Sequence, residues 1–247
     1  MKILVCISKT PDTTTKITFT ENNTKFNDQG VSFIINPSDE WYALVRALEL
    51  KEALGGTVDV VSVGGEDYEP VIRKALALGA DSAVRVNAVA MDAYVTAVQI
   101  AQVAAEGAYD LILTGKETID YNGSGVGGMV AALRDLPYVS LATRLEVDAG
   151  GKASFRREIE GGEELGEAAL PLVVSCMKGM AEPRIPNVRG IMTARTKPIR
   201  VAEPVEAAPL TEVVDFQTPP PREGVKMIPA EDMAELVRLL HTEAKVI

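Results

Sequence analysis

The sequence predicts an α/β protein with a doubly wound, mostly parallel sheet. Over the first two-thirds of the chain, short runs rich in β-branched residues alternate with longer segments of helical periodicity, the pattern of parallel strands covered by helices. Four such strand-to-helix units precede residue 137. With 247 residues, 47% hydrophobic and 24% charged, the chain can bury a sizeable core and is neither disordered nor a disulfide scaffold.

Local signals place the elements of these four units. The first helix opens at Pro37 with Ser38 as its N-cap and acids in its first turn, and Gly55 stops it. Proline after Leu136 ends the fourth helix. We expect strands at 2–7, 57–63, 82–86 and 110–114, further helices at 68–78, 91–105 and 127–134, and a small hairpin excursion within 16–35.

After residue 137 the pattern changes to strands, expected at 141–147, 153–159 and 171–177. The first two should pair as an antiparallel hairpin at the sheet edge, and the third should return to the core. Residues 198–221 hold six of the fourteen prolines and predict a linker or surface arm without strand or helix. A last helix is expected after Asp232. The chain therefore divides into an α/β core, residues 1–200, and a C-terminal arm, residues 201–247.

Charge and composition exclude several classes of function. The net charge of −10 opposes nucleic-acid binding. A single histidine, His241, excludes hydrolase triads and histidine-rich metal sites. Apolar runs are shorter than the ~18–20 residues of a membrane span, and the start is too short for a signal peptide. We expect a cytoplasmic protein without membrane insertion, in which residues 178–200 carry six bases and one acid, and residues 201–247 four bases and nine acids.

A glycine-rich loop, residues 115–126, is the strongest candidate for a ligand site. In doubly wound sheets, ligands bind beyond the carboxyl ends of the strands where strand order reverses, which selects 6–9, 36–39, 63–65 and this loop. Its successive N–H groups, followed by a helix N-terminus, favour phosphate binding. Residues 123–128 also satisfy G-x-G-x-x-G, but eight residues separate them from the preceding strand, unlike a dinucleotide fingerprint. A long surface turn is the alternative.

Other candidates have two interpretations each. Cys6 is either a nucleophile or a small core residue. Asp39 and Glu40 are either an acid–base or metal-binding pair, or acids that favour the helix N-terminus, with Asp39 free to contact a ribose. The basic run from Arg184 to Arg200 binds a phosphate-bearing partner or forms an exposed docking loop.

Six short segments occur in a familiar order along the chain. They are KILVCISK at 2–9, NPSDE at 36–40, KALALGAD at 74–81, GKETID at 115–120, EPR at 182–184 and GIMTAR at 190–195. Together they resemble the beta (small) subunit of electron-transfer flavoprotein, although each segment alone is a weak signal.

This resemblance implies a heterodimer with a larger alpha subunit that holds the redox-active FAD. The small subunit would bind AMP or, as in electron-bifurcating members, a second FAD in its place, and residues 201–247 would dock on the alpha subunit. Electrons would pass from acyl-CoA or similar dehydrogenases to a quinone oxidoreductase or another acceptor. The chain would be an electron-carrier subunit without catalytic residues or a metal of its own.

The resemblance also implies site residues, with the phosphate against the backbone of 123–126. The expected nucleotide contacts are Cys6, Ile7, Ser8, Asn36, Pro37, Ser38, Asp39, Val63, Gly64, Gly115, Lys116, Glu117, Thr118, Ile119, Asp120, Asn122, Gly123, Ser124, Gly125 and Val126. The expected dehydrogenase-docking residues are Glu182, Pro183, Arg184, Ile185, Pro186, Asn187, Val188, Arg189, Gly190, Ile191 and Met192, with Val188 in place of a leucine anchor.

Two departures from the family pattern leave the nucleotide open. Residues 121–126, YNGSGV, lack the extra acid and the glutamine side-chain amide that many members carry after the Ile-Asp pair, and Ser38 replaces the more usual aromatic residue. Two other classes of function remain as alternatives. One is a stand-alone enzyme, either a dinucleotide-dependent oxidoreductase or an ATP-dependent adenylating enzyme, and the other is a nucleotide-sensing module.

Overall fold

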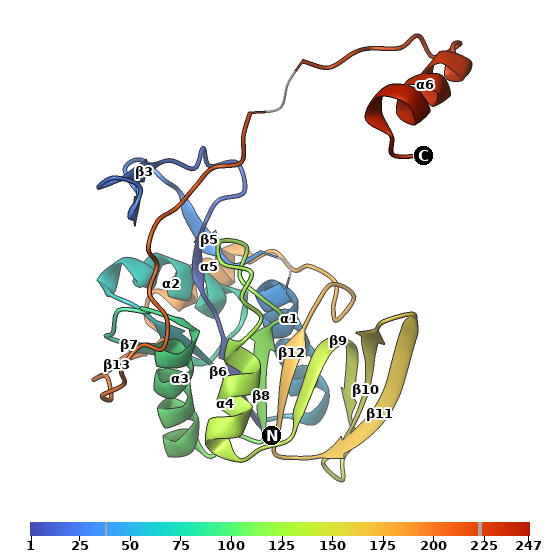
Figure 1. The fold of residues 1–247 in the computed structure, drawn as a ribbon. Helices are drawn as coiled ribbons and strands as arrows, with labels where there is room; N and C mark the ends of the chain where they lie inside the picture. The colour runs from blue at the N-terminus through green and yellow to red at the C-terminus, as the bar shows by residue number, and fades with distance from the viewer. Residues whose placement is uncertain (38, 222–223) are drawn as a thin grey trace.

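A computed structural model describes residues 1–37, 39–221 and 224–247 and shows a nine-stranded sheet with helices on both faces (Figure 1). The strand order is β11-β10-β9-β12-β8-β1-β6-β7-β13. The strands are β1 (Lys2–Cys6), β6 (Thr57–Val63), β7 (Ser82–Val86), β8 (Leu111–Gly115), β9 (Tyr138–Val147), β10 (Lys152–Ile159), β11 (Gly162–Ala169), β12 (Leu172–Cys176) and β13 (Ile199–Ala202). The α/β fold with a mostly parallel sheet is confirmed.

Strand order reverses between β1 and β8. From β1 the chain adds β6 and then β7 on one side, and it then returns to place β8 on the other side of β1. These strands are parallel, with Val5 of β1 opposite Leu113 of β8, so their carboxyl ends lie next to each other. This is the position at which doubly wound sheets bind ligands.

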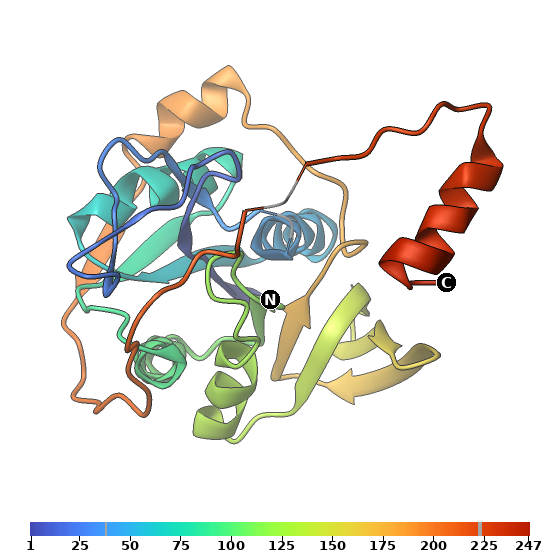
Figure 2. The same cartoon turned by 45° about the horizontal axis from the view of Figure 1, so that its top comes forward.

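Helices cover the two faces of the sheet in pairs (Figure 2). On one face, α1 (Asp39–Leu54) and α2 (Glu69–Leu78) pack on a core that includes Ile3 and Val5. On the other, α3 (Ala93–Gly107) and α4 (Val126–Arg134) pack on a core that includes Leu4. The alternation of β1 side chains between the two cores is what a strand buried on both faces requires.

Two small sheets confirm the expected excursion before α1. Strand β2 (Lys9–Pro11) pairs antiparallel with β5 (Phe33–Ile35), and β3 (Phe19–Thr20) pairs with β4 (Lys25–Phe26). The expected N-cap of α1, Ser38, lies outside the described residues. A short turn of 3-10 helix, η1 (Glu66–Tyr68), leads into α2.

Three elements differ from the sequence prediction. Strand β11 was not expected, because its sequence GEELGEAA is poor in β-formers, yet it pairs with β10 over eight residues, so β11 rather than the predicted hairpin forms the edge. Helix α5 (Val188–Ala194) also lacked a long enough period to be predicted. The prediction of no strand in 198–221 was wrong, since β13 adds to β7.

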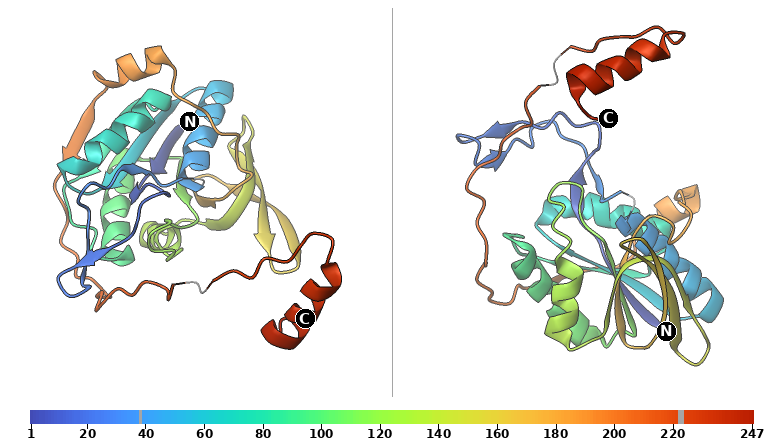
Figure 3. Two further views of the ribbon diagram at one scale, coloured as in Figure 1. Left: turned by 90° about the horizontal axis from the view of Figure 1, so that it is seen from above. Right: turned by 45° about the vertical axis from the view of Figure 1, so that its right-hand side comes forward.

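The C-terminal arm has an inner part fastened to the body and an outer part that extends away from it (Figures 1 and 3). The Gln99 side chain exchanges two hydrogen bonds of 2.9 Å with the Val205 backbone. The ring of Phe216 stacks on that of Phe19 at 4.8 Å. Beyond these contacts lie α6 (Met233–Leu239), the expected last helix, and the π-helical turn η2 (Leu240–Ala244). None of the helices in the described part of the chain is long and apolar enough to cross a membrane.

Candidate functional site

The predicted ligand segments meet at the carboxyl edge of the sheet. Residues 6–8 end β1, residues 36–37 and Asp39 lead into α1, and 63–64 end the neighbouring strand β6. The loop 115–125, which connects β8 to α4, rises above this edge beside β5 (Figure 1). The structure therefore brings these segments together, while Ser38 lies outside the described residues.

Asn36 fixes the glycine-rich loop. Its side chain is fully buried, its Nδ2 donates to the Glu117 carbonyl at 2.8 Å, and its Oδ1 accepts from the Ile119 N–H at 3.0 Å. Its own N–H donates to the Ser8 carbonyl at 3.2 Å. Because both groups of the amide bind the loop backbone, Asn36 positions the loop across 81 to 83 residues of sequence.

Polar contacts within the loop use its charged side chains. Lys116 pairs with Glu117 at 2.8 Å, and the Ser124 hydroxyl donates to Glu117 at 3.0 Å. The bond from Lys116 is the largest of the effects that hold the pKa of Glu117 below its ordinary value. The Glu117 carboxylate therefore links the start of the loop, at Lys116, to its end, at Ser124.

The end of the loop presents free backbone N–H groups. Asn122 and Ser124 both have a left-handed backbone with φ of 50°, whereas Gly125 is right-handed at φ −95°. Alternation of this kind turns successive N–H groups toward one point. From Gly123 to Gly128 the six N–H groups donate no hydrogen bond to a described residue, and no side chain caps α4. We call residues 123–128 the anion nest.

Glu40 is a buried acid at the same edge that sequence analysis left out of the nucleotide contacts. One of its carboxylate oxygens accepts from the Ser8 N–H at 2.6 Å and the other from the Ser8 hydroxyl at 2.7 Å. The pKa of Glu40 is raised to about 8, mainly by burial, which outweighs the lowering by the Ser8 hydrogen bonds and is assisted by nearby Asp120 and Asp39. This shift favours the neutral form of Glu40, which removes one negative charge from an edge that carries several.

Glycines allow close packing under this edge. A Cβ on Gly115 would lie 2.8 Å from Glu40 Cγ, and a Cβ on Gly64 would lie 2.4 Å from the Tyr68 ring. Ala93, at the start of α3, lies close enough to the nest that its Cβ would be 3.9 Å from a Cβ on Gly125. Ala93 is a neighbour of the nest that sequence analysis missed, because no local motif marks it.

Cys6 is part of the core beneath the site. It is buried and free, and burial raises the pKa of its thiol, with Glu40 contributing. A thiol held in its neutral form is a poor nucleophile. Together with the buried Val63 it forms the apolar floor at the ends of β1 and β6.

The predicted docking segment, residues 182–192, lies at a different place. Arg184 contacts Glu52 in the last turn of α1, whereas Gly115, at the base of the glycine-rich loop, packs against Asp39 and Glu40 in the first turn. Helix α1 has sixteen residues and is therefore about 24 Å long at 1.5 Å per residue. The structure therefore separates the predicted nucleotide contacts from the predicted docking residues.

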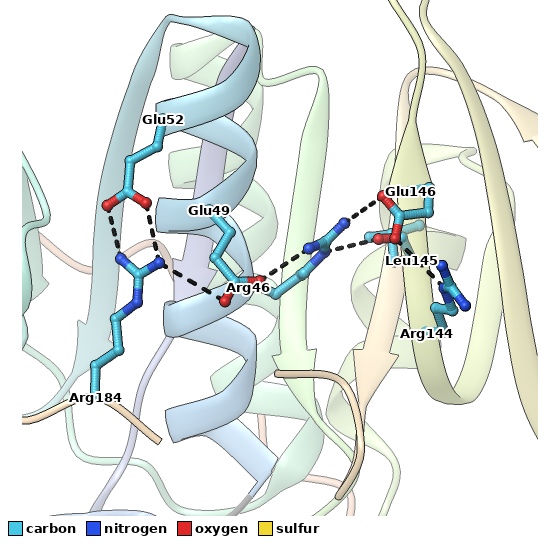
Figure 4. A network of polar contacts seen from close by, with 7 residues as sticks. All are labelled: Arg46, Glu49, Glu52, Arg144, Leu145, Glu146 and Arg184. Atoms are coloured by element: carbon cyan, nitrogen blue, oxygen red, sulfur yellow. Dashed lines mark hydrogen bonds and ion pairs between the residues drawn. The ribbon is translucent and has the colours of Figure 1, made fainter. Parts of the chain in front are cut away.

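A chain of ion pairs ties Arg184 to the body (Figure 4). Its guanidinium donates two bonds to the Glu52 carboxylate, at 2.7 and 2.9 Å, and lies 3.7 Å from Glu49. Arg46 continues the network from Glu49 to Glu146 of β9 at 2.8 and 2.7 Å. The first basic residue of the expected partner contact is thus engaged within the chain.

Apolar side chains of the docking segment face solvent. Ile185 is 90% exposed and Val188 is 75% exposed, and Ile191 and Met192 are exposed as well. Neighbouring exposed apolar side chains on one segment are typical of a protein interaction surface.

Comparison with known proteins identifies the family. A family model described as the electron transfer flavoprotein domain matches residues 23–207. The chain is 38% identical over 261 residues to the electron transfer flavoprotein subunit beta of Bacillus subtilis, with both chains fully covered. It is 33% identical over 244 residues to that of Homo sapiens, covering 94% of this chain and 95% of the relative. It is 34% identical over 216 residues to protein FixA of Azotobacter vinelandii, covering 84% and 76%. The chain belongs to the electron transfer flavoprotein family, among its beta subunits.

Proposed function

We propose that this chain is the small subunit of a heterodimeric electron carrier and that its anion nest holds the phosphate of AMP. The observation that carries this proposal is the run of six N–H groups, Gly123 to Gly128, that have no acceptor among the described residues at the switch point of the sheet. Such groups bind phosphate without a cationic side chain. The pairing of Lys116 with Glu117 fits this view, because the loop cation is already engaged.

The redox chemistry belongs to a partner in this proposal. FAD, held mainly by an alpha subunit, supplies the electron chemistry when bound. The present chain orients the nucleotide through the nest, keeps the loop in place through Asn36, and excludes water with the buried ends of β1 and β6. The arm, residues 201–247, extends toward the alpha subunit and docks on it, while residues 1–200 form the nucleotide-binding core.

The electron route in the proposal follows from the exposed docking segment. Residues 182–192 dock an acyl-CoA or similar dehydrogenase, and electrons leave to a quinone oxidoreductase or another acceptor. The change Val188→Ser is expected to raise the KM for the dehydrogenase about tenfold, since a central apolar contact is worth about 1–2 kcal/mol. Ile159→Ser, on β10 and also exposed, is the matched control.

Extraction of the bound ligands tests the proposal. The chain is co-expressed with its alpha subunit, and the nucleotides of the purified heterodimer are released and quantified. One FAD and one AMP per heterodimer support the proposal, and two FAD would show the electron-bifurcating form. A stable single chain that turns over NAD(P)H or ATP would overturn the proposal in favour of a stand-alone enzyme.

A further inference from the structure

Helix α5, which begins within the docking segment at Val188 and ends just beyond it at Ala194, has little hydrophobic support. It has seven residues, and Ala194 is the one buried residue in this fully described helix. A helix of this length is unstable in water on its own. One buried alanine supplies little of the free energy needed to hold it. Polar contacts with the rest of the chain must therefore supply much of the free energy that stabilises α5.

Arg73 of α2 supplies the main polar contact. Its Nη1 donates to the Ala194 carbonyl at 2.8 Å and to the Lys197 carbonyl at 2.7 Å. Carbonyls at the C-terminus of a helix carry partial negative charge and favour a cation. In return, Lys197 Nζ donates to the Leu76 and Ala80 carbonyls, at 2.9 and 2.6 Å. The C-terminal ends of α2 and α5 thus each receive a cation from the other segment.

Close packing sets the rotation of α5 about its axis. A Cβ on Gly190 would lie 2.3 Å from the Ala77 carbonyl oxygen, so the backbone of α5 lies directly against α2. Asn187 caps the N-terminus of α5 by accepting from the Gly190 N–H at 2.8 Å. With Gly190 turned inward, Val188 and Met192 are left on the exposed side.

We infer that Arg73 is a positioning residue that holds α5 ready for a partner protein, with Val188, Ile191 and Met192 presented as one preformed apolar surface. The role in docking rests on the proposed function, whereas the holding of α5 does not. A surface fixed before binding loses less conformational entropy when the partner docks. Arg73 therefore acts on docking without touching the partner.

The test uses the heterodimer with Arg73→Ala. Amide hydrogen exchange of residues 188–196 is expected to accelerate about tenfold or more, because the two bonds to the end of α5 are lost. The KM for an acyl-CoA dehydrogenase reduced by its acyl-CoA is expected to rise about fivefold with kcat unchanged. Arg73→Lys should restore much of the protection, because one ammonium group can donate to both carbonyls.

The matched control is Lys74→Ala, which removes the same charge from the next position of α2. Lys74 is exposed, and its Nζ lies 5.1 Å from the centre of the Trp41 ring in the first turn of α1. This variant is expected to leave exchange of residues 188–196 and the KM unchanged.

The outcomes separate this inference from the proposed function. Unchanged exchange in Arg73→Ala overturns the inference, whatever happens to electron transfer. Faster exchange with an unchanged KM, in a heterodimer that Val188→Ser does impair, overturns the role in docking. Normal transfer in both variants overturns the docking function itself, while the exchange data still decide whether Arg73 holds α5. If Arg73→Ala does not fold, Arg73→Gln should give an intermediate acceleration, and none would overturn the inference.

Discussion

The anion nest and the docking segment are held in opposite ways and leave different groups free. A buried amide, Asn36, holds the nest loop from inside the sheet edge, and backbone donors remain unpaired. In the docking segment, Arg184 pairs with Glu52, Arg73 of α2 holds the C-terminal end of α5, and apolar side chains remain uncovered. Free N–H groups suit an anion, whereas uncovered apolar side chains suit a protein surface. What each region leaves unpaired indicates the chemistry of what it binds.

The largest effect is expected from Asn36→Ala, which is compared with Asn187→Ala in the docking segment. Asn36→Ala leaves the Glu117 carbonyl and the Ile119 N–H without their partner, at a cost of about 2–4 kcal/mol. The affinity of the heterodimer for AMP should fall by about 30- to 1,000-fold, because each 1.4 kcal/mol is tenfold. Asn187→Ala, which removes the cap of α5, should leave AMP content intact and weaken dehydrogenase docking. Loss of AMP in both variants would contradict the independence of the nest and the docking segment.

A side chain in the nest should have the next largest effect. At Gly125 a Cβ meets ordinary contacts, 3.6 Å from Met129 Cε, and its φ of −95° suits other residues, so Gly125→Val is expected to fold. The valine methyls crowd the free N–H groups, and AMP affinity should fall about 30-fold or more by isothermal titration, the loss of one or two charge-assisted hydrogen bonds. Gly162→Val, at the start of β11, where a Cβ meets nothing within 4 Å, is the matched control outside the nest. Full AMP retention in Gly125→Val would mean that the phosphate lies elsewhere.

Several of these features could be predicted from sequence, because local signals mark them. The parallel strands, the helix stops and the glycine-rich loop follow from residue patterns within a few positions. Strand β11 could not be predicted, since pairing with β10 overrides the low β-propensity of its glycines and acids. The support of α5 by Arg73 was equally hidden, because the two groups lie 121 residues apart. Which donors of the nest remain free, and that Asn36 serves the loop backbone, required the folded structure.

A rise in pH is expected to have a smaller effect, which weakens AMP binding at the nest and leaves the docking segment unchanged. Glu40 is an acid whose pKa is raised by burial to about 8, so the folded chain holds its proton more tightly than the unfolded chain. Stability from this group is present below about pH 4.5 and is lost as pH rises through about 8. Above that pH the new charge, beside Asp39 and Asp120 and opposed by Lys116 near Asp39, repels the phosphate.

Binding of AMP should therefore weaken about three- to tenfold between pH 7 and pH 9, and Glu40→Gln should flatten this profile. Glu52→Gln, at the far end of α1, is the control, because the hydrogen bond from Arg184 holds the pKa of Glu52 below its ordinary value. A pH profile that stays the same in Glu40→Gln would contradict the assignment.

The smallest effect is expected at the surface network of the docking segment. Arg184→Ala removes a bidentate pair with Glu52, but both side chains are partly exposed, at 36% and 60%. The free energy of unfolding in urea should fall by about 0.2–1 kcal/mol. The double exchange Arg184→Glu with Glu52→Arg should recover part of it. A loss above about 2 kcal/mol would show that this ion pair contributes as a buried pair does, contrary to its exposure.

The central claim, that the backbone of residues 123–128 binds the phosphate, is tested most directly by glycine-selective 15N labelling of this chain in the heterodimer. Amide resonances are compared before and after AMP is added to the nucleotide-free protein. Resonances of Gly123, Gly125, Gly127 and Gly128 are expected to shift, while those of Gly150 and Gly161, in turns of the antiparallel strands, and of Gly162, at the start of β11, stay in place. AMP that binds tightly and leaves the four nest resonances unmoved would contradict the account.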